Sequence, residues 1–175
     1  SNSGDINING NLKNFGSGNV DVISTNGINV STTGSVSGNG RVNILNNGVN
    51  NTNIEGKLTG KGVDITNKQS DLYVGNRSIN DNVVSFGNIN INLEDGSLIN
   101  NGTTNTHFVT NGGNLSIKTP KGSVGEQVGG GCVGNVCTGV DTSSRDLYKS
   151  INVRVDGTVN AQSKDVVNLA SIDAD

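Results

Sequence analysis

The chain repeats a short alternation of apolar and polar residues that begins at a glycine. The run Gly18-Asn-Val-Asp-Val22 sets the pattern. Close copies follow at 40–44, 87–91 and 113–117, and looser copies lie at 4–8, 63–65 and 153–155. An alternation with a period of two is typical of a strand with one buried face. The pattern therefore predicts a short strand at each of these places.

A second apolar element follows the first at a fixed offset. Gly27-Ile28, Gly96-Ser-Leu98 and Gly122-Ser-Val124 each begin nine residues after the glycine of a first element. Related copies lie at 34–36, 56–58 and 157–159. Since glycine commonly marks a turn between strands, each unit is expected to read strand, glycine turn, strand.

The distance between units predicts the architecture. The first elements are anchored at residues 18, 40, 61, 87 and 113, so successive units are 22, 21, 26 and 26 residues apart. Two short strands cannot bury an apolar face alone, but equivalent strands stacked in parallel about 4.8 Å apart bury one another. We therefore expect an all-β, parallel β-helix (β-solenoid) with coils of about 20–26 residues, formed by residues 1–175 as one segment.

The alternation also predicts which side chains face inward and which face solvent. The expected inward row is Val20, Val22, Val42, Ile44, Val63, Ile65, Ile89, Ile91, Leu115 and Ile117. The expected outward stack is Asn7, Asp21, Asn43, Asp64, Asn90 and Ser116. Stacked amides can donate and accept along such a ladder. Neutral Asn43 between Asp21 and Asp64 would keep like charges off adjacent strands.

Composition narrows the classes of function. The chain has 31 Asn and 26 Gly among its 175 residues and an apolar content of 31%, which is low for a compact globular domain. Disorder is disfavoured because the net charge is only -3 and Val, Ile and Leu recur in register. The twelve scattered Lys and Arg make nucleic acid an unexpected partner, and no apolar run suits a membrane span. The N-terminal residues lack the features of a signal peptide, so the sequence favours a piece of a longer exported protein over a cytosolic one.

Runs such as GNVDVISTNGINVSTTGSVSG and GNININLEDGSLINNG resemble the passenger repeats of large bacterial exoproteins of the filamentous-haemagglutinin type, which are adhesins secreted by the two-partner route. The resemblance covers residues 4–124 and 150–172. It implies a right-handed β-helix, secreted or on the bacterial cell surface, that acts in adhesion or as a structural stalk. The implied partners are glycans or proteins on a host or neighbouring cell. Unpaired strands at the solenoid ends would also favour end-to-end self-association.

Residues 125–149 interrupt the repeat and are expected to form a loop or hairpin excursion that carries binding function, with Arg145 and Tyr148 as contact residues. The excursion holds Cys132 and Cys137, which are half a zinc site at best and do not have redox C-x-x-C spacing. A disulfide between them, worth roughly 2 kcal/mol by loop closure, is the expected state. Two free thiols are the alternative.

No catalytic, cofactor-binding or metal-binding residues are assigned, so a non-enzymatic role is expected. Candidate acids for a glycan-cleaving β-helix, either a lyase or hydrolase or a phage tail fibre, are Glu55, Asp64, Glu94, Asp95, Asp141 and Asp156. Such an enzyme, or a glycan-binding relative, is the alternative, and catalysis would require two or three of these carboxylates to converge on consecutive coils. Turn residues that bond the local backbone explain Glu94, Asp95 and Asp156 equally well. The single histidine, His107, is expected in an exposed loop. Glycosylation stays open at the sequons Asn29, Asn50, Asn76, Asn101 and Asn114.

Overall fold

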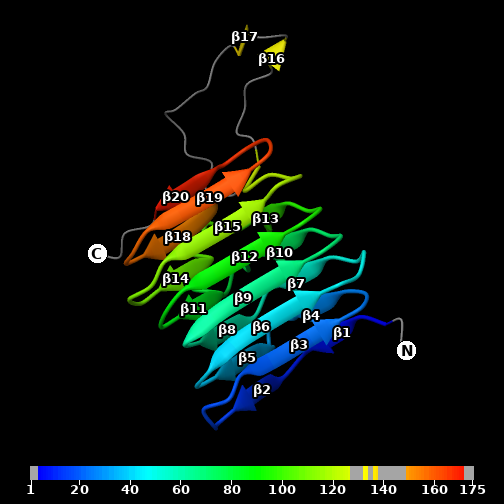
Figure 1. Cartoon of the computed structure of the whole chain (residues 1–175), viewed down its shortest axis with the longest axis vertical. Helices are drawn as coiled ribbons and strands as arrows, with labels where there is room; N and C mark the ends of the chain where they lie inside the picture. Colours follow the sequence, from blue (N-terminus) through cyan, green and yellow to red (C-terminus); the bar gives the residue numbers. More distant parts are fainter. Residues whose placement is uncertain (1–3, 127–131, 134–135, 138–148, 172–175) are drawn as a thin grey trace.

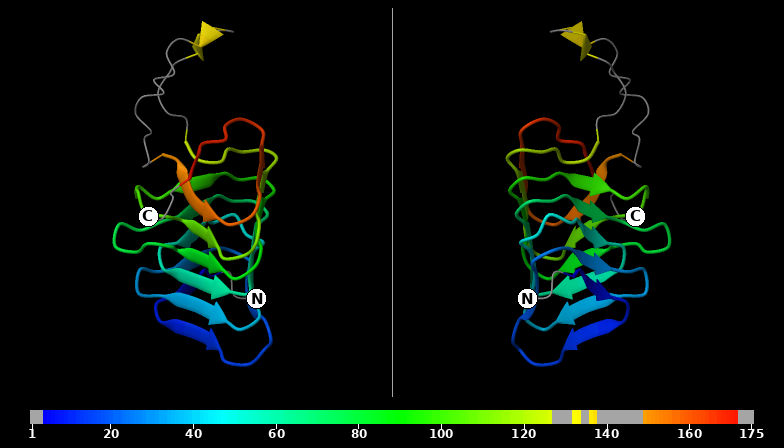
Figure 2. Two further views of the ribbon diagram at one scale, coloured as in Figure 1. Left: turned by 90° about the vertical axis from the view of Figure 1, so that its left-hand side faces the viewer. Right: turned by 90° about the vertical axis from the view of Figure 1, so that its right-hand side faces the viewer.

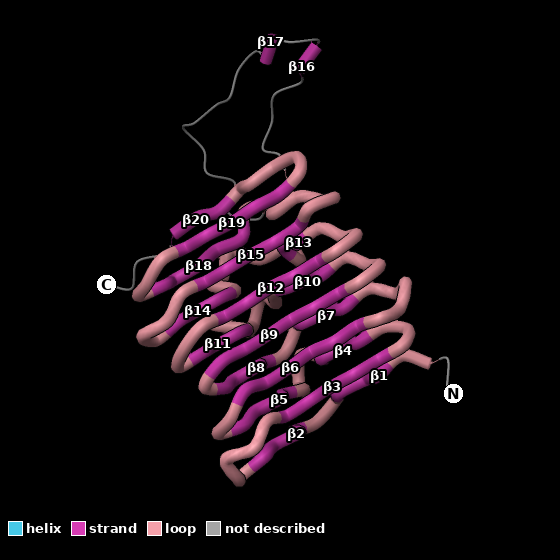
Figure 3. The backbone as a smooth tube through the Cα atoms, viewed as in Figure 1, coloured by secondary structure: helices cyan, strands magenta, loops and turns pink. Residues whose placement is uncertain are grey.

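A computed structural model of the chain describes residues 4–126, 132–133, 136–137 and 149–171. Within these residues there are strands, turns and bends, and the tube in Figure 3 shows no helical segment. That part of the chain accordingly contains no helix long and apolar enough to cross a membrane. Three parallel sheets, which we name A, B and C, make up the body of the fold.

Strands that are neighbours in a sheet are hydrogen-bonded to each other, and each sheet has a fixed spatial order. From one end to the other, sheet A contains β1 (Ile6–Ile8), β4 (Ile28–Val30), β7 (Thr52–Ile54), β10 (Leu72–Val74) and β13 (Leu98–Asn100). Sheet B contains β2 (Asn11–Asn14), β5 (Ser35–Gly38), β8 (Lys57–Gly60), β11 (Val83–Ser85), β14 (Phe108–Thr110), β18 (Ile151–Val155) and β20 (Leu169–Ser171). Sheet C contains β19 (Val159–Ser163), β15 (Leu115–Thr119), β12 (Ile89–Leu93), β9 (Gly62–Asn67), β6 (Arg41–Asn46) and β3 (Val20–Ser24).

The chain passes through the three sheets in turn. β1, β2 and β3 form a first coil, and four further coils repeat the order A, B, C as far as β15. Beyond Lys149 the chain continues as β18 in sheet B and β19 in sheet C, and β20 then joins sheet B. Figures 1 and 2 show the coils stacked along one axis. The predicted parallel β-solenoid is confirmed.

The register of sheet C reproduces the predicted coil lengths. Val20 pairs with Val42, Val42 with Val63, Val63 with Ile89, and Ile89 with Leu115, which are the predicted steps of 22, 21, 26 and 26 residues. All ten residues of the predicted inward row are buried. Equivalent apolar side chains from successive coils thus pack on one another to form the core cluster.

Each coil contains three strands, whereas the sequence predicted two. The glycine elements at 34–36 and 56–58 belong to sheet B, while those at 27–28 and 96–98 belong to sheet A. The two kinds look alike in the sequence because a three- or four-residue strand contributes few core side chains, such as Val36 in β5. A short strand of this kind carries no local mark of its sheet.

The predicted outward stack is confirmed in sheet C except for one member. Asp21, Asn43, Asp64, Asn90 and Ser116 follow one another in register. Asn7 is the exception, because it pairs with Asn29 in sheet A and does not continue this stack. The copy at 153–155 is likewise a strand of sheet B, and Val159 is the residue that pairs with Leu115 in sheet C.

The longer coils differ from the shorter ones in the turns between sheets A and B. Residues 55–56 are sufficient to join β7 to β8, whereas residues 75–82 join β10 to β11 and residues 101–107 join β13 to β14. These two long turns therefore account for the change from about 21 to 26 residues per coil. They lie on adjacent coils, so their residues can contact one another.

Candidate functional site

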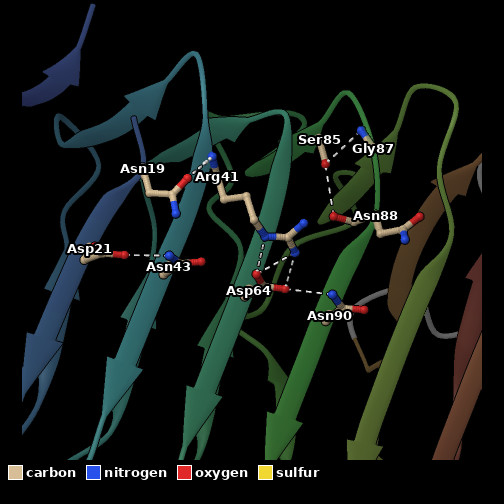
Figure 4. Close-up of polar contacts among 9 residues, drawn as sticks. All are labelled: Asn19, Asp21, Arg41, Asn43, Asp64, Ser85, Gly87, Asn88 and Asn90. Atoms are coloured by element: carbon tan, nitrogen blue, oxygen red, sulfur yellow. Dashed lines mark hydrogen bonds and ion pairs between the residues drawn. The ribbon is translucent and has the colours of Figure 1, made fainter. Parts of the chain in front are cut away.

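The outer faces of sheets A and C carry side-chain ladders that bond to themselves. On sheet C, Asn43 donates to the carboxylate of Asp21 at 2.5 Å, and Asn90 donates to Asp64 at 2.7 Å (Figure 4). On sheet A, Asn29 donates to Asn7 at 2.9 Å, and Asn53 donates to Asn29 at 2.6 Å. These faces owe their asparagine content to stacking, because each amide meets its equivalent on the next coil.

The Gly-Asn pair of the repeat also has a structural role. The side-chain oxygen of Asn88 accepts the backbone N–H of Asn114 at 2.9 Å, and Asn114 does the same for Thr158 at 2.8 Å. The glycine before each asparagine lies against the coil below, and a Cβ added at Gly113 would come within 2.1 Å of the Gly87 backbone. Glycine is therefore required for coil-to-coil contact at this corner, and asparagine satisfies the adjacent N–H.

One coil departs from this rule at the corner between sheets B and C. The anchor position holds Lys61 where the neighbouring coils have glycine, and the next position holds Gly62 where the repeat has asparagine. Packing explains Gly62, because the guanidinium of Arg41 lies over it and binds Asp64 through two hydrogen bonds of 2.6 Å (Figure 4). Packing does not explain why a lysine stands at position 61.

Lys61 lines a groove on the outer side of sheet B. The groove has a volume of about 410 Å³, and its other lining residues include Lys13, Ser37, Asn39, Thr59 and Phe86. Lys13, Ser37 and Thr59 are in register on β2, β5 and β8, so the groove crosses consecutive coils. The small side chains of Ser37 and Thr59 form its floor between the longer side chains of Lys13, Lys61 and Phe86.

The polar groups of this groove are not used by the fold. In the described part of the chain, the hydroxyls of Ser37 and Thr59 and the ammonium of Lys61 make no hydrogen bond or ion pair. The ammonium of Lys13 lies over the ring of Phe15, 4.7 Å from its centroid. Phe15 and Phe86 are 78% and 63% exposed, although burial is the usual fate of a phenylalanine. These groups are therefore available to a ligand.

A second, smaller hollow lies beside the long turns between sheets A and B. It has a volume of about 290 Å³ and is lined by Asp81, Arg154 and the Thr104–Thr106 segment, among others. The carboxylate of Asp81 is 3.3 Å from the guanidinium of Arg154. Because this ion pair neutralises the charges on its walls, the hollow offers less to a charged ligand than the groove does.

The candidate acids lie at separate places on the solenoid. Asp64 is on the outer face of sheet C, Glu55 is in a turn between sheets A and B, and Asp156 is in a turn between sheets B and C. Glu94 and Asp95 are in a turn between sheets C and A, where Asp95 binds Lys121 and its hydrogen bond raises the lysine pKa. Asp156 accepts the backbone N–H of Gly112 at 2.8 Å, as the turn interpretation expects. Among the described residues, no group of three or more His, Cys, Asp and Glu side chains could hold a metal. Asp141 lies outside the described residues.

His107 is buried, and its predicted exposed position was wrong. Its side chain is 0% exposed, and it occupies a column of sheet B between Asn82 and Asn152, which are also buried. Nδ1 of His107 accepts the backbone N–H of Asn152 at 2.9 Å, while Nε2 has no partner in the described part of the chain. Burial lowers the pKa of His107 from 6.5 to about 4, so the imidazole is neutral at neutral pH. The sequence could not show this, because the long turns that cover the histidine are polar.

The excursion begins and ends at one point on the solenoid. The backbone N–H of Glu126 donates to the carbonyl of Lys149 at 2.8 Å. Within the interrupted segment, β16 (Cys132–Val133) pairs antiparallel with β17 (Val136–Cys137), and Cys132 is opposite Cys137. Directly opposite residues have Cα atoms about 4.5–5.5 Å apart, within the range that a disulfide needs. Arg145 and Tyr148, the predicted contact residues, lie outside the described residues, and the disulfide stays a prediction.

The comparisons with known proteins do not extend this description. No protein-family model matches the chain, and no curated protein or solved structure matches it. The groove on sheet B was missed in the sequence, although two signals pointed to it. One is the lysine in a column otherwise held by glycine, and the other is the position of Phe15 and Phe86 directly after strands of sheet B in a chain with only 3% aromatic residues.

Proposed function

We propose that this chain is a non-enzymatic β-helical segment of a secreted or surface-exposed bacterial adhesin or filament, and that it binds its partner through the groove on sheet B. The partner is a glycan or protein on a host or neighbouring cell. The sequence resemblance to exoproteins of the filamentous-haemagglutinin type supports this proposal. So does a rigid stack of coils, because a solenoid offers an extended surface on which one ligand contacts several repeats.

The contrast between the three outer faces carries the proposal. The ladders of sheets A and C connect Asn7 to Asn53 and Asp64 to Asn90 through bonds within the fold. The groove on sheet B instead presents two lysines, two hydroxyls and an exposed phenylalanine that the fold does not use. Exposed polar and aromatic groups gathered in a concave surface are typical of binding sites.

Binding is favoured over cleavage by the placement of the acids. Glycoside hydrolysis generally needs two carboxylates within about 5–10 Å of each other, on either side of the scissile bond. The described candidates, Glu55, Asp64, the pair Glu94 and Asp95, and Asp156, lie on one sheet face and in three different kinds of turn. Of the residues that the structure describes, no Asp or Glu lines the groove.

Binding and cleavage can be measured on the same sample. The purified chain would be applied to a glycan array and to bacterial and host cells, and each glycan that binds would be tested for release of reducing sugar. Binding without release is the expected result. Release of sugar would refute the non-enzymatic assignment, and a chain that binds neither glycans nor cells would refute the adhesive function.

A further inference from the structure

We propose that the groove on sheet B binds an acidic polysaccharide, with the sugar chain lying along the solenoid axis across the coils of β2, β5, β8 and β11. This inference rests on the proposed function, because it names the ligand class of the same site. The groove joins side chains from four coils, from Lys13 in β2 to Phe86 in the turn after β11.

The charge of the groove selects an anion. Lys13 and Lys61 line it, and no acidic residue in the described part of the chain does. Neither ammonium has an ion-pair partner among the described residues, whereas Arg41, Lys121 and Arg154 all do. A carboxylate on the ligand would therefore form charge-assisted hydrogen bonds without displacing an existing partner.

The spacing of the groove suits a polymer. Lys13 and Lys61 are two coils apart, or about 10 Å along the axis, since stacked parallel strands lie about 4.8 Å apart. A single small anion cannot reach both lysines, but acidic groups repeated along an extended chain can. Ser37 and Thr59 lie on the intervening coils, and their hydroxyls can exchange hydrogen bonds with ring hydroxyls between the two charges.

The phenylalanines favour a sugar chain over an acidic peptide. Phe86 lines the groove, and Phe15 follows β2 at the equivalent corner, three coils or about 14 Å away. An exposed aromatic ring is a flat apolar surface, and it suits the C–H face of a pyranose ring. Single-stranded nucleic acid also combines stacking with negative charge, but its sites track the backbone with a strongly positive groove, and this chain has a net charge of -3.

The test uses three polymers and the complete chain. Polygalacturonate is the acidic probe, dextran is the neutral probe, and oligo-deoxythymidine is the nucleic acid, each measured by biolayer interferometry at 20 mM and at 300 mM NaCl. Polygalacturonate is expected to bind most tightly, and its affinity should fall as salt screens the two lysines. Dextran is expected to bind at least tenfold more weakly.

Three substitutions locate the binding. Lys13→Ala and Lys61→Ala should each weaken polygalacturonate binding roughly three- to tenfold, as expected for the loss of an exposed charge-assisted contact. Phe86→Ala should weaken it by a similar factor and leave the salt dependence unchanged. The matched control is Lys118→Ala, since Lys118 is exposed on sheet C and its loss changes net charge equally. Far-UV circular dichroism would check that each variant is folded.

The outcomes separate this inference from the proposed function. Equal binding of dextran and polygalacturonate would overturn the acidic ligand and leave an adhesin. Tighter binding of oligo-deoxythymidine would overturn the glycan assignment. An equal loss in Lys118→Ala would show that bulk charge, and not the groove, holds the polymer. Absence of binding to all three polymers, together with binding to cells, would also refute the inference while preserving the adhesive function.

Discussion

His107 links the stability of the solenoid to pH. Its pKa is about 4 in the folded chain because of burial, and an unfolded histidine has a pKa near 6.5. Between these values the unfolded chain takes up a proton that the folded chain does not. The stabilisation is therefore fully present above about pH 6.5 and is lost as the pH falls toward 4. The full loss is about 3 kcal/mol, of which about 2 kcal/mol falls between pH 7.5 and pH 5.

His107→Asn isolates this effect from the titration of carboxylates. Asparagine does not titrate, and asparagine already occupies the adjacent positions of the same column at Asn82 and Asn152. The free energy of unfolding would be measured by urea denaturation of both chains from pH 7.5 to pH 5. The natural chain is expected to lose about 2 kcal/mol more than the variant over this range, whatever their difference at pH 7.5.

The titration itself can be observed directly. The chain has a single histidine, so one pair of imidazole signals in the NMR spectrum reports on His107 without assignment. The folded signals should remain those of neutral imidazole down to about pH 5, and the urea-unfolded chain should titrate near pH 6.5. A folded midpoint near 6.5, or equal pH dependence of the two chains, would refute the burial argument.

Three further predictions follow from the coil contacts and the excursion. Gly113→Ala should lower the free energy of unfolding by at least about 2 kcal/mol, because its Cβ would meet the backbone of the coil below, whereas Gly10→Ala, with no atom within 4 Å of the added Cβ, should change it by less than about 1 kcal/mol. Equal urea midpoints for these two variants would contradict the close approach. Replacement of residues 127–148 by two glycines should leave the solenoid folded and stabilise it by up to about 2 kcal/mol, since the flanking residues are already hydrogen-bonded and a shorter loop costs less entropy to close; loss of cooperative thermal unfolding would count against a self-sufficient solenoid. Mass spectrometry of the unreduced chain should detect a crosslink between Cys132 and Cys137, and full alkylation of both thiols without reductant would exclude it.

The sequence by itself determined the repeat and its phase in sheet C. The alternation of apolar and polar residues marks which side chains are buried, and the glycine anchors mark the coil length, because both depend on local geometry that every coil shares. For this reason the row from Val20 to Ile117 and the unequal coil lengths were predicted correctly from the order of residues.

The tertiary structure alone decided which strands share a sheet and what covers them. Asn7 and Asp21 have the same local pattern, yet they lie on different sheets, because sheet membership depends on which residue of the next coil is stacked above. His107 is buried by turns from two coils, and the groove joins Lys13 to Phe86 across four. Such environments are formed by residues far apart in sequence, so no local pattern specifies them.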